Sequence, residues 1–284
     1  MFTSYFKTAI RSLMRHKTSS LINVVGLSIG ISASLVVYLI VQYEFSFDKF
    51  HRDGDRVYRV VTKIDFAGET GRNSGVPMPL AKGVKETVSG VAEATHFVTA
   101  NYTKVTVPEA GKSALSTFKQ QRDIIYADND YFKFFDYHWL AGSPTSALVE
   151  PFQVVLTESR AKLYFPEVSP VDVISRHLIY DDSITVTVSG VVEDLNEVTD
   201  FTFLEFISMG TVERTGLKER WGWSEWGNTS SASQFFVRLM PGVIPSSVEK
   251  QLAQLRDKHR DNANEKDDMQ HLLQTLSDIH FNAD

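Results

Sequence analysis

Two short polar stretches contain the residue types that phosphate or metal chemistry would use. Residues 110–113 read Ala-Gly-Lys-Ser, but Thr106 replaces the glycine that a phosphate-binding loop needs five positions before its second glycine. His51 lies near Asp53 and Asp55, yet a second histidine at helical spacing and the full calcium-loop pattern are lacking. We therefore predict a polar loop and a solvated turn at these places, with no metal site and no cofactor.

Sequence motifs for covalent catalysis are also lacking. The chain has no cysteine, which excludes disulfides and thiolate sites, and it has no G-x-S-x-G motif. Asp128 and Asp130 precede a short helix that we expect over Tyr131–Phe135, so we predict that they cap this helix. Residues 181–183 are predicted to form a hairpin turn between two strands. Catalytic residues are not expected, and we predict that the chain is not an enzyme.

Three tryptophans lie close together in the segment WGWSEWGNTSS, at positions Trp221, Trp223 and Trp226. Clustered aromatic side chains outside a membrane can bind apolar or sugar ligands, or lie at the level of the lipid headgroups. They can also cover the edge of a hydrophobic core. The three tryptophans are therefore candidates for a contact surface, and the sequence leaves both interpretations open.

The stretch from Thr18 to Tyr43 carries no charged residue. Its apolar part, Leu21–Val41, is long enough to cross a bilayer core about 30 Å thick. The apolar region of a signal peptide is shorter and ends in a small-residue cleavage site, which this stretch lacks. We therefore predict a transmembrane helix over residues 18–43.

Charged residues on the two sides of this helix predict its orientation. Because basic flanks stay in the cytoplasm, we expect a cytoplasmic N-terminus and an extracytoplasmic segment 44–284; the basic residues are Lys7, Arg11, Arg15 and Lys17. Residues 1–17 have the pattern of a basic amphipathic helix. Such a helix sets the topology and anchors the chain, and a contact with a cytoplasmic partner is a further interpretation.

Within the apolar helix, Gly26 and Gly30 form a G-x-x-x-G pair, and Ser34 continues the same spacing. Small residues at this spacing allow a second helix to approach closely. Gly26, Gly30 and Ser34 are thus the candidate residues for helix packing in the membrane.

The amino-acid composition indicates that the segment after the apolar helix, residues 44–284, is a folded globular protein. Apolar residues make up 43% of the chain and charged residues 23%. The net charge of −6 argues against nucleic acid as a partner. We expect β-α-β arms near residues 55–98 and 234–276, on both sides of a strand-rich segment in which Ile184, Val186 and Val188 alternate.

Each arm has its own local sequence signals. In the first arm, we expect a loop over Gly68–Gly75 and a return strand over residues 94–98. In the second arm, Ser246 and Glu249 are predicted to form a capping box before a helix whose apolar stripe is Val248, Leu252 and Leu255.

In this order, several segments resemble the N-terminal part of MacB-like ABC transporter permeases, the FtsX-related class. The matching segments are FKTAIRSLMRHKTSSLINVVGLSIG, YEFSFDKFHRDGDRVYRVV, VPMPLAKGVKE, YADNDYFKFFDYHWLAGSPTSALVEPFQVVLTESRAKLYF, ITVTVSGVVEDL and LQTLSDIHF. The resemblance implies an α+β fold in which one N-terminal transmembrane helix precedes a two-lobed periplasmic core domain. A porter-like lobe would comprise about residues 48–100 and 202–281, and an inserted strand-rich, Sabre-like lobe about residues 101–201.

The resemblance also implies a function in the bacterial inner membrane. The chain would be a non-catalytic permease subunit, or its N-terminal half, that relays the motion of a cytoplasmic ABC ATPase subunit to the periplasmic lobes (mechanotransmission). Expected cargoes are drugs, peptides, lipids or lipoproteins. Expected partners are this ATPase, a second permease copy or paralogue, a periplasmic adaptor and membrane lipid.

Two features depart from the family pattern. Residues 169–174 replace a D-P-x-G-K-like turn, and the family continues after D-I-H-F with three more transmembrane helices, whereas this chain ends at Asp284. We therefore expect a fragment or a truncated product. The alternative function is a singly membrane-anchored periplasmic binding or adaptor module without transport activity.

Overall fold

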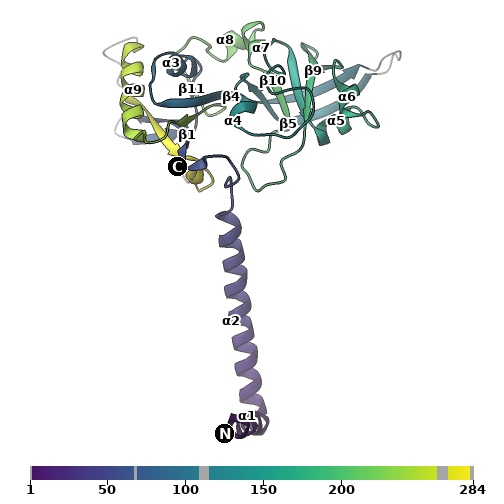
Figure 1. The fold of residues 1–284 in the computed structure, drawn as a ribbon, viewed down its shortest axis with the longest axis vertical. Helices are drawn as coiled ribbons and strands as arrows, with labels where there is room; N and C mark the ends of the chain where they lie inside the picture. Colours follow the sequence, from purple (N-terminus) through teal and green to yellow (C-terminus); the bar gives the residue numbers. More distant parts are fainter. Residues whose placement is uncertain (1, 67–68, 109–114, 261–267, 282–284) are drawn as a thin grey trace. The chain divides into compact units, whose positions relative to one another are not determined.

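A computed structural model describes residues 2–66, 69–108, 115–260 and 268–281 (Figure 1). By its contacts the chain divides into two compact units, residues 1–47 and residues 48–284. The first unit is helical, and the second combines one large sheet with helices. This arrangement confirms the predicted α+β class with one N-terminal apolar helix.

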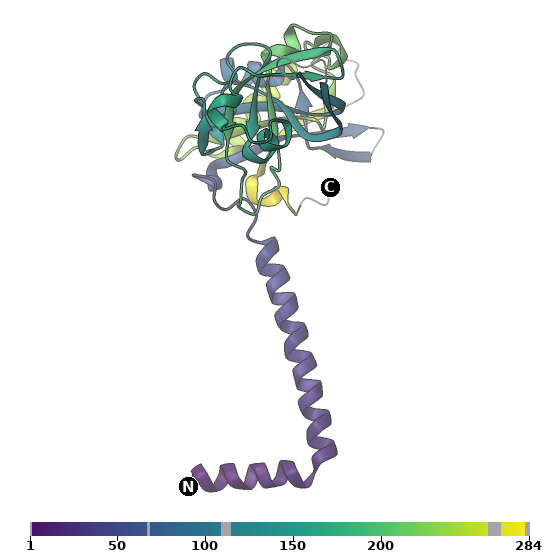
Figure 2. The same ribbon diagram turned by 90° about the vertical axis from the view of Figure 1, so that its right-hand side faces the viewer.

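The first unit consists of α1 (Phe2–Arg15) and α2 (Lys17–Glu44). The chain turns at His16 between the two helices (Figure 2). α2 has 28 residues, so at 1.5 Å per residue it is about 42 Å long and exceeds the thickness of a bilayer core. None of its side chains is buried, and it is the one helix among the described residues that is long and apolar enough to cross a membrane.

Part of the second unit has the split β-α-β topology in which two β-α-β arms interleave. The strands lie in the order β13-β1-β12-β4, so a strand of the second arm separates the two strands of the first. The helices α3 and α9 contact each other (Figure 1). The six elements are β1 (Val57–Phe66), α3 (Leu80–Thr87), β4 (Val91–Pro108), β12 (Ser233–Leu239), α9 (Pro245–Lys258) and β13 (Asp268–Thr275).

Hydrophobic periodicity explains this half of the unit. Val248, Leu252 and Leu255 form the buried stripe of α9, as predicted, and Leu80 and Val84 form that of α3. Both stripes pack in one cluster with apolar residues of β1, β4 and β12. The two helices therefore cover one face of the four-stranded part.

The remaining strands close into a small barrel. β4 pairs with β5, β5 with β10, β10 with β7, β7 with β9, β9 with β8, and β8 again with β4. Alternating apolar side chains such as Ile184, Val186 and Val188 of β9 belong to the cluster that these strands share. The strands are β5 (Leu115–Ala127), β7 (Gln153–Thr157), β8 (His177–Tyr180), β9 (Ile184–Val192) and β10 (Glu205–Ser208), and β6 (Trp139–Ala141) adds to β9.

Short elements complete the unit. They are η1 (Gly54–Arg56), β2 (Glu69–Asn73), β3 (Val76–Pro77), α4 (Tyr131–Phe134), α5 (Glu158–Tyr164), α6 (Pro170–Val173), α7 (Gly210–Glu213), α8 (Leu217–Arg220), β11 (Thr229–Ser230) and α10 (Leu276–Ile279). α4, the residues that follow it and the segment around residues 201–206 supply most of the aromatic side chains of a cluster that also includes Phe97 of β4 and Phe236 of β12. The strand-rich middle is thus present, while the lobe boundaries near residues 101 and 201 stay a prediction.

Several local expectations were wrong. Residues 69–73, expected in a loop, form β2, which pairs with β1 beyond the end of its ladder with β12. The return strand expected over residues 94–98 is confirmed, but it is only part of the longer strand β4, which extends from Val91 to Pro108. Ser246 and Glu249 form no capping box: Ile244 is the N-cap residue of α9, and the Glu249 carboxylate instead accepts the N–H of Leu273 at 3.0 Å.

Candidate functional site

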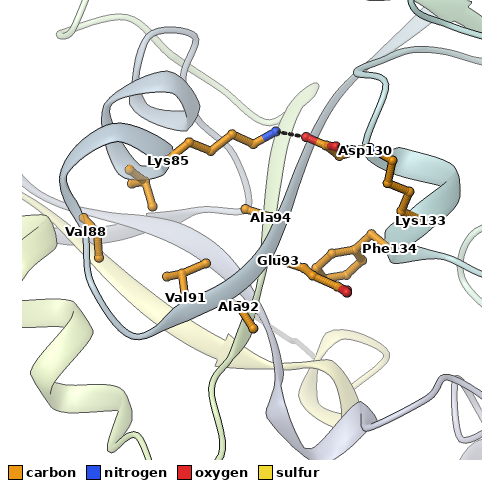
Figure 3. A pocket seen from close by; sticks show the side chains of 10 residues that line it. Lys85, Val88, Val91, Ala92, Glu93, Ala94, Asp130, Lys133 and Phe134 are labelled. Carbon is orange, nitrogen blue, oxygen red and sulfur yellow. Dashed lines mark hydrogen bonds and ion pairs between the residues drawn. The ribbon is translucent and has the colours of Figure 1, made fainter. Parts of the chain in front are cut away.

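A pocket of about 280 Å³ lies between α3, the first residues of β4, and α4 (Figure 3). Its apolar lining residues are Val84, Val88, Val91, Ala92, Ala94 and Phe134. Its charged lining residues are Lys85, Glu93, Asp130 and Lys133. The pocket therefore combines an aliphatic lining with charged groups of both signs.

Lys85 connects α3 with the segment that begins α4. Its Nζ lies 2.8 Å from a carboxylate oxygen of Asp130 (Figure 3). It also lies 2.8 Å from a carboxylate oxygen of Asp128. Burial opposes the charged form of Lys85, but the two carboxylates outweigh burial and raise its pKa above the usual value. Lys133 Nζ lies 3.0 Å from the second oxygen of Asp130. One side of the pocket is thus closed by an ionic bridge.

Asp128 fixes the end of strand β5. Its carboxylate accepts hydrogen bonds from the Thr95 hydroxyl at 2.7 Å, the His96 N–H at 3.1 Å and the Asp130 N–H at 3.2 Å. Burial raises the pKa of Asp128 although Lys85 acts in the opposite direction. The expectation that Asp128 and Asp130 cap α4 with their side chains is wrong, because Asp130 is the N-cap residue without a side-chain capping bond and the Asp128 carboxylate binds the N–H of Asp130, which precedes the helix.

Arg238 organises the opposite side of the pocket. Its guanidinium pairs with Glu93, donates to the Phe134 carbonyl at 2.9 Å and lies 4.8 Å from the centre of the Phe134 ring. These contacts hold α4 against β12 and the first residues of β4.

A buried ionic network that we did not predict lies in the barrel. Glu205 is fully buried in β10, accepts hydrogen bonds from the hydroxyls of Tyr164 (2.6 Å) and Tyr180, and lies 3.2 Å from Nε of Arg160. Burial raises the pKa of Glu205, while Arg160 and the two hydroxyls oppose this shift. A sequence signal exists, since Glu205 interrupts the apolar segment FLEFISM.

The three tryptophans are half-buried and pack on two different clusters. Trp221 and Trp223 lie against the barrel cluster, where Trp221 meets the Tyr126 ring edge-on at 5.2 Å. Trp226 packs on the cluster of α3 and α9 and stacks on the His259 ring at 3.9 Å between ring centres. The contact surface proposed for these residues stays a prediction.

We expect Trp226→Ala to lower the free energy of unfolding by about 2 kcal/mol, roughly half the cost of truncating a fully buried tryptophan. The physical reason is that the ring covers Gly83 and Leu255 of the helix pair as well as His259. Urea denaturation of the detergent-solubilised chain measures the change, with Trp226→Phe as the control that keeps a flat ring. Unchanged stability would show that the ring is free for a contact surface.

The predicted residues of the apolar helix share one stripe of α2. A Cβ atom added to Gly26 or Gly30 would meet nothing within 4 Å, and the Ser34 hydroxyl donates to the Gly30 carbonyl at 2.9 Å. Because that hydroxyl is satisfied within the helix, the stripe presents a small and smooth surface.

The predictions for the two polar stretches, residues 110–113 and the turn around His51, can be compared with the structure only in the second case. Residues 109–114, which contain the Ala-Gly-Lys-Ser stretch, lie outside the described residues. The prediction of a solvated turn is wrong for His51, whose side chain is 6% exposed, lies 3.3 Å from Asp48 and packs on the rings of Phe135 and Phe201. Aromatic packing around one histidine leaves no sign in the local sequence.

Comparisons with known proteins agree with this architecture. Residues 20–255 match the family model of the MacB-like periplasmic core domain. A domain of a protein described as a permease from Porphyromonas gingivalis is similar in structure, with a TM-score of 0.64 and 21% identity over 80% of this chain and 92% of that one. The periplasmic region of MacB from Actinobacillus actinomycetemcomitans gives a TM-score of 0.51 and 16% identity over 79% and 90% of the two chains. The comparison with curated proteins gave no match.

Proposed function

Because the chain belongs to the family of MacB-like periplasmic core domains, we propose that it is a non-catalytic permease component of an ABC exporter. The observation that carries this proposal is the family match over residues 20–255, which includes most of α2 and of the second unit. In this function ATP is hydrolysed by a separate cytoplasmic ATPase subunit. The chain contributes the membrane helix and the extracytoplasmic domain, with its N-terminus in the cytoplasm.

Mechanotransmission requires that a displacement reaching the start of the second unit is passed to its sheet. Asp48, the first residue of this unit, is buried; its N–H donates to the Val198 carbonyl at 3.0 Å and its carboxylate accepts from the Thr199 hydroxyl at 2.5 Å. Arg56 donates to the Leu239 carbonyl at the end of β12 at 2.8 Å. These contacts support a relay, because they tie the entry segment to the end of β12 in the central sheet and to the segment just before Phe201 of the aromatic cluster.

The expected partners follow from this proposal. One partner is the cytoplasmic ATPase. The other is a second copy of the permease or a paralogue, whose membrane helix would contact the stripe of Gly26, Gly30 and Ser34. The cargo classes are those expected of such exporters: drugs, peptides, lipids or lipoproteins.

The proposal predicts that the full-length protein co-purifies with an ABC ATPase and stimulates its ATP hydrolysis. Gly26→Leu with Gly30→Leu should reduce the recovery of a second, differently tagged permease copy about tenfold, because the added side chains separate the helices. Val25→Leu with Ile29→Leu, on another face of α2, is the matched control and should change nothing. If no ATPase associates with the protein, the singly anchored binding or adaptor module is the better description.

A further inference from the structure

Strand β4 has an open edge where it borders the pocket. On one side β12 pairs with β4 from Val91 to Val98. On the other side the ladder with β5 begins only at Phe97, which lies opposite Ala127 at the end of β5. In the part of the chain that the structure describes, no strand pairs with residues 91–96 on this second side.

The backbone groups at this edge can be assigned from the hydrogen-bond pattern. His96 points its N–H and C=O toward the open side, where the Asp128 carboxylate and the Asp128 N–H bind them at 3.1 Å each. In an antiparallel ladder, alternate residues point the same way. Ala94 therefore directs its N–H and C=O away from β12 and into the pocket. Ala94 and Val237, which lie opposite each other, thus form a non-hydrogen-bonded pair of the ladder between β4 and β12.

The side chains around the edge lie on two faces of the sheet. Ala94 belongs to the cluster of Val84 and the other residues under α3, whereas Phe134 belongs to the aromatic cluster on the α4 face. A strand added to this edge would place successive side chains alternately on these faces. One side chain would enter the aliphatic part of the pocket (Figure 3), and the next would lie on the side of Lys133.

Charge and size restrict the occupant. Lys133 is half exposed, and its partner Asp130 is shared with Lys85. The carboxylate of Glu93, which also lines the pocket, is paired with Arg238, so an acidic group can approach Lys133 favourably. Pockets for small-molecule ligands measure about 300–1,000 Å³. The volume of about 280 Å³ lies at the lower end of this range, where it is large enough for individual side chains.

We propose that the β4 edge at residues 91–94 docks an extended segment of a partner polypeptide. The segment adds to the sheet as a strand, hydrogen-bonds to the N–H and C=O of Ala94, and carries an aliphatic residue next to an acidic one. The aliphatic side chain fills the space beside Val84 and Val88, and the acidic group pairs with Lys133. This inference goes beyond the proposed function, since it concerns the second unit alone.

The first experiment identifies the segment in the assembled full-length protein. A photo-crosslinking amino acid at Ala92, which is exposed and lines the pocket, is compared with the same amino acid at Val171, which is exposed on α6. We expect mass spectrometry to find one polypeptide segment crosslinked at position 92 and absent at position 171. Crosslinks to lipid alone, no crosslinks, or the same products at both positions overturn the proposal.

The second experiment uses a synthetic peptide with the sequence of that segment. Hydrogen exchange of the Ala94 amide in the full-length protein should slow at least tenfold when the peptide is bound. Lys133→Glu should weaken peptide binding about tenfold, while Lys162→Glu, an exposed and ion-paired lysine of α5, should leave it unchanged. Strand addition is overturned if the peptide binds without slowing hydrogen exchange of the Ala94 amide, or if Lys133→Glu leaves the affinity for the peptide unchanged. The proposed function is tested separately, by association with the ATPase, so neither result of the peptide experiment decides it.

Discussion

Arg160→Ala is expected to lower the free energy of unfolding by about 3–5 kcal/mol, which is the usual cost of removing one member of a buried ion pair. Glu205 is fully buried in the barrel, and Arg160, itself 7% exposed, is the cation beside it. The substitution leaves the carboxylate without a cationic partner in a region that excludes water. It also removes the hydrogen bond from Arg160 to the Arg122 carbonyl at 2.9 Å.

Denaturant unfolding of the detergent-solubilised chain measures this loss. Lys162→Ala is the matched control, because Lys162 lies on the same helix and pairs with Glu158 on the surface, where such pairs contribute under about 1 kcal/mol. Combining Arg160→Ala with Glu205→Gln should recover part of the stability, since glutamine keeps an acceptor for the tyrosine hydroxyls and removes the buried charge. A cost for Arg160→Ala no larger than that of the control would contradict the assignment of a stabilising pair.

Elements with strong periodicity were predictable from the sequence. The apolar helix, the alternating strand through Ile184, Val186 and Val188, and the stripe Val248, Leu252 and Leu255 all agree with the structure. β2 was missed because its residues are polar and glycine-containing, and they form a strand only through pairing with β1. Intrinsic strand preference is weak, and tertiary pairing overrides it.

The pocket was not predictable, because its parts are distant in sequence and ordinary in composition. Lys85 of α3 contacts Asp128 and Asp130 only in the folded chain, because both α3 and the end of β5 are positioned by their contacts with β4. Nothing local in the sequence indicates that β12 inserts between β1 and β4, which leaves the other edge of β4 to this pocket. Topology of this kind depends on contacts across the whole chain, whereas sequence patterns report neighbours within one element.

Two buried histidines are expected to make the second unit strongly sensitive to acid. Burial lowers the pKa of His96 to about 3, helped by the nearby charge of Lys85, and burial lowers that of His271 to about 4, helped by Arg256. His96 Nε2 forms a hydrogen bond with the Ser233 hydroxyl at 2.9 Å, and His271 Nδ1 forms one with the Thr62 hydroxyl at 3.2 Å. Both rings are therefore neutral in the folded chain at neutral pH.

The sign of the pH dependence follows from proton linkage. In the unfolded chain both histidines take up protons below about pH 6.5, whereas in the folded chain they remain neutral down to about pH 4. Unfolding thus takes up protons in this window, and the stability that is present above pH 6.5 is lost as the pH falls. Each histidine contributes a slope of about 1.4 kcal/mol per pH unit, so the two together cost about 4 kcal/mol between pH 8 and pH 5.

His271→Gln tests one half of this slope, because glutamine can keep a hydrogen bond to Thr62 and does not titrate. Relative to the unmodified chain, we expect its unfolding free energy to fall less steeply between pH 6 and pH 4.5, by about 1.2 kcal/mol per pH unit. Other titrating groups contribute equally to both proteins, so the difference between the two curves isolates the histidine. Above pH 7.5 the curves should run parallel, which is the internal control. Curves that stay parallel down to pH 4.5 would show that the pKa of His271 is the same in the folded and the unfolded chain, and the packing of β13 against β1 around Thr62 would then have to be different.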